Sequence, residues 1–94
     1  MLESKIQAKI LKNLKALDIY AYKNITTNKK GVPDIVCVCD GKAIFLEVKN
    51  EKGKPSELQL YNIEQIRKSG GIAEIVRSWT EVQDILRRIN DEQK

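Results

Sequence analysis

Histidine is absent from this sequence, which excludes histidine zinc sites, serine–histidine triads and histidine general bases. Cysteine is scarce: Cys37 and Cys39 are too few for a zinc site, and alternate residues of one strand are poorly placed for a disulfide. We expect both to be small, reduced core residues. No run approaches the ~20 apolar residues of a membrane span, and charges interrupt the amino-terminal stretch where a signal peptide would lie, which predicts a cytoplasmic protein.

Length and charge set the broad class. The 94 residues predict a single domain over residues 1–94, with a core over about 2–77 and a carboxyl-terminal helix over about 80–89. Hydrophobic residues make up 41% and charged residues 32% of the chain, as in a soluble globular protein. The net charge of +4 permits nucleic-acid binding without requiring it, and so small a core is expected to gain stability from oligomerisation.

Hydrophobic periodicity and turn residues predict an α/β domain in the order α-β-β-β-α-β-α. Ser56 and Gln59 form a capping-box pattern before the second helix, and Thr80 and Gln83 form another before the last. A strand that returns to the sheet after a helix lies parallel to its neighbour, so we expect a mixed four-stranded sheet flanked by helices. The expected helices cover residues 2–17, 57–69 and 80–89, and the expected strands cover residues 19–26, 34–39, 43–49 and 72–77.

The dipeptide Asp40-Gly41 is the strongest local signal in the chain, because it is typical of a type I′ hairpin turn. With these residues at the centre of the turn, paired residue numbers sum to 81, as 40 and 41 do, and Asp34 lies directly opposite Glu47. Period-2 alternation places Lys49 on the same face as Glu47. The turn therefore predicts that two carboxylates and one ammonium converge at one end of the hairpin.

Opposed carboxylates repel each other, and a divalent cation is the simplest means of offsetting that repulsion. Mg²⁺ takes oxygen ligands, so Asp34 and Glu47 fit it, and the carbonyl of Val48 is a further candidate ligand. Such an ion polarises phosphoryl oxygens, and Lys49 beside it would stabilise negative charge or orient the nucleophile, as in a phosphodiester hydrolase. The sequence patterns around these residues also have an ordinary structural explanation. Pro-Asp, as at Asp34, is common in turns, and Glu-x-Lys, as at Glu47, is common at solvated strand ends.

The motifs stand in an order that resembles a known family. Gly31-Val32-Pro33-Asp34 and Glu47-Val48-Lys49, with Glu3 on the preceding helix and Gln59 on the following one, resemble the VRR-NUC branch of the PD-(D/E)XK nuclease superfamily. The resemblance covers roughly residues 3–77. It implies a restriction-endonuclease-like α-β-β-β-α-β core, dependence on Mg²⁺ or Mn²⁺, and DNA as the substrate.

The resemblance also implies a role for each of five residues. Glu3, Asp34 and Glu47 would bind the metal, Lys49 would be catalytic, and Gln59 would assist at the site or contact the DNA backbone. Two of these residues have an alternative role within the chain. A glutamate in the first helical turn suits the helix dipole, and Gln59 suits the capping box.

Stand-alone members of this branch are small, often phage- or prophage-encoded, and look like homodimeric Holliday-junction resolvases. The expected function is therefore a metal-dependent, structure-selective DNA endonuclease that acts on four-way junctions, in the cytoplasm of a bacterium or of a phage host. A two-fold homodimer would supply two active sites for symmetric cutting. The rival hypotheses are a flap, nicking or duplex nuclease, a catalytically idle nucleic-acid-binding subunit, and a small interaction module without a DNA role.

Basic and aromatic side chains are the expected partner contacts. We expect lysines around the site to contact DNA phosphates, with solvated surface lysine as the alternative. Tyr20, Tyr22, Tyr61 and Trp79 are candidates for a dimer interface, but core packing is the expected role of each. The candidate DNA-binding lysines are Lys23, Lys29, Lys30, Lys52 and Lys54.

Overall fold

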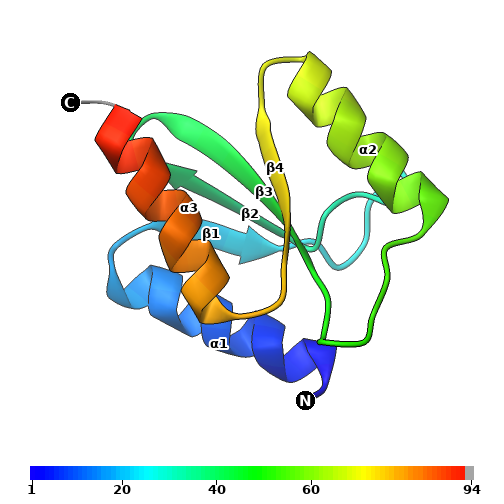
Figure 1. The fold of residues 1–94 in the computed structure, drawn as a ribbon, viewed down its shortest axis with the longest axis horizontal. Helices are drawn as coiled ribbons and strands as arrows, with labels where there is room; N and C mark the ends of the chain where they lie inside the picture. The colour runs from blue at the N-terminus through cyan, green and yellow to red at the C-terminus, as the bar shows by residue number, and fades with distance from the viewer. Residues whose placement is uncertain (93–94) are drawn as a thin grey trace.

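The computed structural model describes residues 1–92 and has the predicted α-β-β-β-α-β-α order (Figure 1). The elements are α1 (Glu3–Ala16), β1 (Tyr20–Lys23), β2 (Ile35–Cys39), β3 (Lys42–Val48), α2 (Glu57–Lys68), β4 (Ile72–Val76) and α3 (Trp79–Glu92). The strands form one sheet in the order β1-β2-β3-β4, in which β1, β2 and β3 are antiparallel neighbours and β4 lies parallel to β3. The predicted α/β fold with a mixed four-stranded sheet is therefore confirmed.

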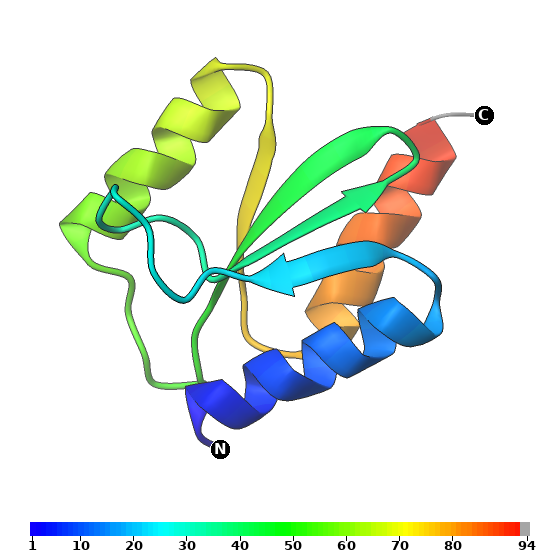
Figure 2. The ribbon, with the colours of Figure 1, turned by 180° about the vertical axis from the view of Figure 1, so that it is seen from behind.

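The sheet separates α1 and α3 from α2. Helices α1 and α3 pack together on one side of the sheet, and α2 packs beside β4 on the other, as two opposite views show (Figures 1 and 2). The main core lies on the side of α1 and α3, where the apolar stripe of α1 packs on alternate residues of the central strands. Its fully buried members include Ile10, Leu14, Ile35, Ile44 and Leu46.

The face of the sheet toward α2 is only partly covered, because α2 lies over β4 rather than across the whole sheet. On β1, Tyr20 is 70% exposed and Tyr22 is 46% exposed. Tyr61 on α2 is exposed as well. The expectation that the three tyrosines pack in the core is therefore wrong, whereas Trp79 is half-buried and does pack against the core.

The β2–β3 hairpin has the predicted turn. Asp40 has a φ of 52° and Gly41 a φ of 77°, the left-handed values that a type I′ turn requires at both central positions. Cys39 pairs with Lys42, and the ladder continues with the same register along both strands. The predicted register, in which paired residue numbers sum to 81, is confirmed.

The first strand is shorter than predicted and ends at Lys23 instead of residue 26. Asn24 turns its side-chain amide to the carbonyl of Pro33, at 2.7 Å, and Ile25 is 87% exposed to solvent. The β-branched and polar residues after Lys23 therefore have no sheet neighbour against which they could pack, and the chain leaves the sheet as a loop.

The last helix is longer than predicted, and its amino-terminal cap lies two residues earlier. The Ser78 hydroxyl accepts the N–H of Glu81 at 3.3 Å, and the Glu81 carboxylate accepts the N–H of Arg77 at 2.8 Å. The expected start at Thr80 with a Gln83 capping box is therefore wrong. The earlier cap places Trp79 inside the helix, where it reaches the core, and the helix continues to Glu92 instead of ending at residue 89.

The cysteines are free, as expected: Cys37 is buried and Cys39 is half-buried. Burial raises the pKa of the Cys37 thiol to about 11, so this side chain behaves as a small apolar group. Within residues 1–92, every helix lacks the length and hydrophobicity that crossing a membrane requires.

Candidate active site

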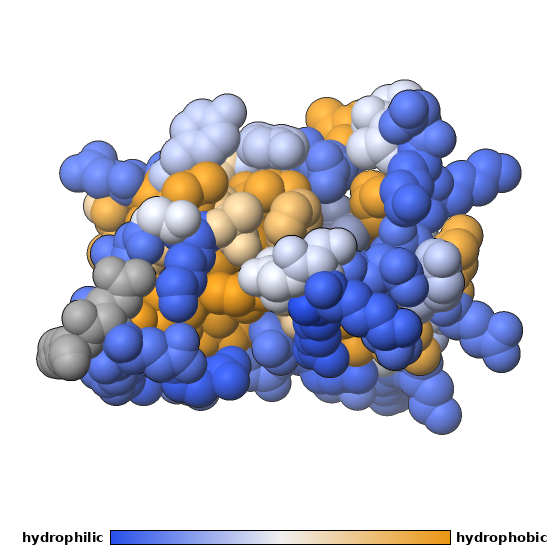
Figure 3. Space-filling view, turned by 90° about the horizontal axis from the view of Figure 1, so that it is seen from above, coloured by the Kyte–Doolittle hydropathy of each residue, from blue (hydrophilic) through white to orange (hydrophobic). Residues whose placement is uncertain are grey.

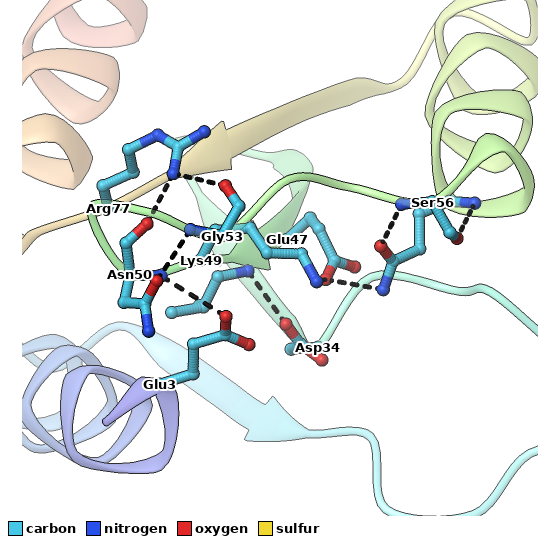
Figure 4. A network of polar contacts seen from close by, with 10 residues as sticks. Glu3, Asp34, Glu47, Lys49, Asn50, Gly53, Ser56 and Arg77 are labelled. Atoms are coloured by element: carbon cyan, nitrogen blue, oxygen red, sulfur yellow. Dashed lines mark hydrogen bonds and ion pairs between the residues drawn. The ribbon is translucent and has the colours of Figure 1, made fainter. Parts of the chain in front are cut away.

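The β2–β3 hairpin brings the predicted acidic pair together (Figure 4). The register that pairs Ile35 with Leu46 continues to Asp34 opposite Glu47, on the face of the sheet toward α2. The backbone N–H of Val48 donates to Asp34 Oδ2 at 2.8 Å, which fixes the orientation of this carboxylate. The two carboxylates thus meet at the open end of the hairpin, as the turn predicts.

Pro33 explains why the ladder between β2 and β3 ends at this point. It stands opposite Val48 in the same register, but it has no N–H to donate, so a regular pair cannot form. Its carbonyl accepts the Asn24 side-chain amide instead, and the Asn24 backbone N–H donates to the carbonyl of Asp34 at 2.8 Å. The N–H of Val48 is therefore left for the carboxylate of Asp34.

Gly31 allows the loop that precedes Asp34 to pass close to α2. Its φ is +78°, and a Cβ atom there would lie 2.7 Å from Leu58 Cγ and 3.0 Å from Asn62 Nδ2. Asn62 is buried and donates to the carbonyls of Lys30, at 3.1 Å, and Leu58, at 2.9 Å. This buried amide ties the loop to the helix, and the loop lies beside α2 in Figure 2. The glycine of the motif thus serves close packing, which holds Asp34 in place.

Glu47 is buried in the middle of the site, with 1% of its surface exposed. Its Oε2 accepts from Gln59 Nε2 at 3.0 Å and lies 3.8 Å from Lys49 Nζ. Its Oε1 is buried and has no hydrogen-bond donor among the described residues. Burial, and then the carboxylate of Asp34, raise the pKa of Glu47 to about 8, against the lowering effect of the Lys49 charge. In the absence of a cation Glu47 is therefore mostly protonated at neutral pH.

Gln59 caps α2 and also contacts the buried Glu47. Its Oε1 accepts the Ser56 N–H at 2.8 Å, and the Ser56 hydroxyl accepts the Gln59 N–H at 3.1 Å, so the predicted capping box is confirmed. The other end of the same amide, Nε2, donates to Glu47. One side chain therefore caps α2 and holds one oxygen of the buried carboxylate.

A second polar network holds the loop that follows β3 (Figure 4). Asn50 donates its N–H to Glu3 Oε2 at 3.5 Å, and its side-chain oxygen accepts the N–H of Gly53 at 2.7 Å. The Arg77 guanidinium donates to the carbonyls of Asn50 and Gly53, the latter at 2.8 Å. The sequence does not indicate Arg77, because its partners are backbone carbonyls of a distant segment, and no side-chain motif reports such a contact.

The donor set at Asp34 and Glu47 fits a hard divalent cation. Two carboxylates meet there, and the buried Glu47 Oε1 lacks a protein donor, which a cation would replace. Glu3 stands apart, since its carboxylate accepts the Asn50 N–H and its charge is the smallest of the effects on the pKa of Glu47. Within residues 1–92, no three His, Cys, Asp or Glu side chains are grouped so that they could hold a metal ion. The structure thus assembles an acidic pair and leaves Glu3 outside it.

The five candidate DNA-binding lysines are all exposed and lie in two groups around the acidic pair. The first group belongs to the end of β1 and the loop that leads to Asp34, and the second to the loop that follows β3. Within the described residues, none of the five takes part in a salt bridge, so their charges remain available to an anion. The first group is Lys23, Lys29 and Lys30, and the second is Lys52 and Lys54.

Comparison with known proteins identifies the family and agrees with the fold. The family described as the VRR-NUC domain matches residues 1–80. A solved structure described as a VRR_NUC domain is 29% identical, with a TM-score of 0.77 over 90% of this chain and 94% of its own. Another, described as a VRR_NUC domain protein, is 17% identical and shares the fold, with a TM-score of 0.78 over 94% of this chain and 87% of its own. No curated protein matches the chain.

Proposed function

The chain belongs to the VRR-NUC domain family of nucleases, and we propose that it is a metal-dependent, structure-selective DNA endonuclease that resolves Holliday junctions. The observation that supports the proposal best is the buried Glu47 carboxylate, with one oxygen unpaired, opposite Asp34 and beside Lys49. Facing carboxylates at a hairpin end destabilise the fold, so a purely structural hairpin gains nothing from them. They are useful where a cation and a phosphodiester are to be held.

Asp34 and Glu47 would hold a Mg²⁺ or Mn²⁺ ion, with the carbonyl of Val48 as a further ligand. The Val48 N–H points to Asp34, and in an extended strand the carbonyl of a residue points to the same side as its N–H. Glu3, on α1, would act from outside this pair by accepting the Asn50 N–H and so holding the loop that follows β3. When bound, the ion would polarise a phosphoryl oxygen and lower the pKa of the attacking water.

Lys49 and Gln59 would act on the substrate and on Glu47, respectively. The Lys49 side chain is only 13% exposed, and its ammonium lies 3.8 Å from Glu47, so its charge is poorly screened by water and would lie close to a phosphate bound at the acidic pair. It would stabilise the negative charge that develops on the phosphate in the transition state. Gln59 would position Glu47 by binding Oε2, which leaves Oε1 for the cation.

The two lysine groups around the acidic pair would contact DNA phosphates and position the backbone without reading sequence. Symmetric cutting of a four-way junction needs two active sites related by a two-fold axis, which a homodimer would supply. Tyr20 on β1 and Leu60 and Tyr61 on α2 are exposed apolar side chains available to such an interface. Light scattering at several protein concentrations measures the oligomeric state directly.

The decisive experiment compares labelled four-way junctions, flaps and linear duplex, each incubated with Mg²⁺, Mn²⁺ or EDTA. Paired symmetric cuts in the junction that require metal are expected. Preferred cutting of flaps or duplex would replace the resolvase assignment with another nuclease specificity. Asp34→Asn should abolish cutting and retain DNA binding. If the wild-type protein bound DNA but cut none of the substrates with either metal, the nuclease proposal would fail and an idle binding subunit would remain.

A further inference from the structure

An open cavity of about 500 Å³ lies between α2 and the sheet, and none of the proposed metal-binding or catalytic residues lines it. Its floor is a row of neighbours across the sheet, in which Tyr22 of β1 pairs with Val36 of β2, and Val36 pairs with Phe45 of β3. Side chains of α2, among them Gln65 and Ile66, form one wall, and the loop between β1 and β2 forms the other. Cavities of this size accommodate small organic groups.

The lining of the cavity combines flat apolar surface with amide groups. Tyr22 and Phe45 provide aromatic rings on the floor, and Asn28 and Gln65 provide amides in the walls. Figure 3 shows that hydrophobic residues reach the surface between polar side chains on the face seen from above. Aromatic rings stack on the faces of nucleobases, and amides bond to the edges of bases, so this combination suits an unpaired base.

The charges around the cavity favour a nucleic acid over a second copy of the chain. Lys29 lines the cavity, and Lys23 and Lys30 adjoin lining residues along the chain. None of the lining residues, all within the described part of the chain, is acidic. A second copy has a net charge of +4 and would bring like charge to this lysine-rich edge, whereas DNA brings opposite charge.

The cavity adjoins the acidic pair along the chain. Pro33 lines it, and the next residue is Asp34, so one peptide bond separates the cavity wall from the acidic pair. Consecutive Cα atoms are about 3.8 Å apart, close to the rise of about 3.4 Å per nucleotide along a DNA strand. Asn24, another lining residue, donates to the backbone carbonyls of both Pro33 and Asp34 and holds them fixed.

We infer that this cavity binds one unpaired nucleobase of the strand that is cut, within a nucleotide or two of the scissile phosphate. The inference rests on the proposed function and deepens it. A base inside an intact duplex is stacked and paired and must be extruded before it can enter a pocket. Branched DNA offers unpaired bases without that penalty. The cavity would therefore give the enzyme a physical means of preferring branched DNA over duplex.

The test uses a splayed-arm duplex in which the nucleotides next to the fork are replaced, one at a time, by an abasic residue. Binding is measured in EDTA, so that no strand is cut. For the wild-type protein, removal of the base at one position of one arm should weaken binding about 10-fold, which is the loss expected for one base–aromatic stack. Tyr22→Ala should reduce this difference to about 2-fold or less, because the ring is already gone. Ile25→Ala, at an exposed residue of the loop that follows β1 and outside the cavity lining, should keep the full difference.

Two results would overturn the inference. One is equal affinity of the wild-type protein for every abasic probe, and the other is an undiminished difference in Tyr22→Ala. If Tyr22→Ala instead halved the particle mass and left the abasic difference intact, the cavity would belong to an interface between two copies. Strand cutting in Mg²⁺ is scored separately. Abasic discrimination without cutting would uphold the cavity and refute the nuclease proposal, and cutting without discrimination would do the reverse.

Discussion

Replacement of Glu47 by glutamine is expected to stabilise the metal-free protein at neutral pH while abolishing its activity. The carboxyl group ionises near pH 4.5 in the unfolded chain, and its pKa is raised to about 8 in the folded protein. Between these values the folded state holds a proton that the unfolded state has lost, so the free energy of unfolding falls as the pH rises. The amide introduced by Glu47→Gln does not titrate, and it can still accept from Gln59 and donate to Asp34.

Each unit of pKa difference corresponds to about 1.36 kcal/mol, so Glu47 lowers the stability of the wild-type protein by about 3 kcal/mol between pH 4.5 and pH 7. The loss levels off above pH 8. For a domain of this length, about 3 kcal/mol corresponds to a shift of about 15 °C in Tm. Thermal or urea unfolding of both proteins from pH 4.5 to pH 8.5, in EDTA, should therefore give curves that meet in acid and separate toward pH 8.

Magnesium should narrow the difference in stability between the two proteins. A cation that binds the ionised pair stabilises the wild-type protein by about 1.4 kcal/mol at ten times its Kd, whereas Glu47→Gln loses an ionised ligand and should respond less. Glu64→Gln is the matched control, since Glu64 is an exposed residue of α2 and lies outside the acidic pair. If the wild-type protein and Glu47→Gln lost stability in parallel between pH 5 and pH 8, Glu47 would not carry a proton in the folded protein at neutral pH, and the reasoning would be refuted.

Three further predictions concern the residues around Glu47. Lys49→Met should cut DNA at least about 100-fold more slowly with Tm changed by only a few degrees, because the charge is lost and the length of the side chain is kept; cutting at the wild-type rate would remove Lys49 from the chemistry. Ser56→Ala and Gln59→Ala should each lose a capping interaction of about 1 kcal/mol, but only Gln59→Ala should also slow DNA cutting. If the two variants cut DNA at the same rate, Gln59 would act only as a helix cap. In urea unfolding, Gly31→Ala should destabilise the protein by about 3 kcal/mol and Gly41→Ala by about 1 kcal/mol. Both glycines have positive φ, but only a Cβ at Gly31 would meet a close neighbour. Equal losses would refute that close contact.

The parts of the site that the sequence predicts correctly all depend on local chemistry. A two-residue Asp-Gly turn fixes the hairpin register, and the register alone brings Asp34 opposite Glu47. The capping box at Ser56 depends on a spacing of three residues and can be recognised in the same way. Each of these features requires no knowledge of how distant segments pack, because all of the atoms involved lie within one turn or one hairpin.

The features that the sequence could not reveal depend on contacts between distant segments. Nothing near Gln59 in the chain indicates that its amide nitrogen reaches Glu47, because α2 must first dock beside β4. Arg77 and Asn62 hold loops by binding backbone carbonyls, which leave no mark in a sequence pattern. The exposure of Tyr20 has the same origin, since α2 covers the edge of the sheet at β4 and leaves β1 open.

The two ends of the Gln59 side chain connect the first turn of a helix to a buried acid. Helix ends unravel before helix centres as a protein is warmed. When the start of α2 frays, the amide swings away and Glu47 loses the neighbour that orients it. Catalysis should then fail at a temperature at which the rest of the fold is still intact, so the upper limit of the enzyme's working range would be set by one loosened helical turn and not by global unfolding.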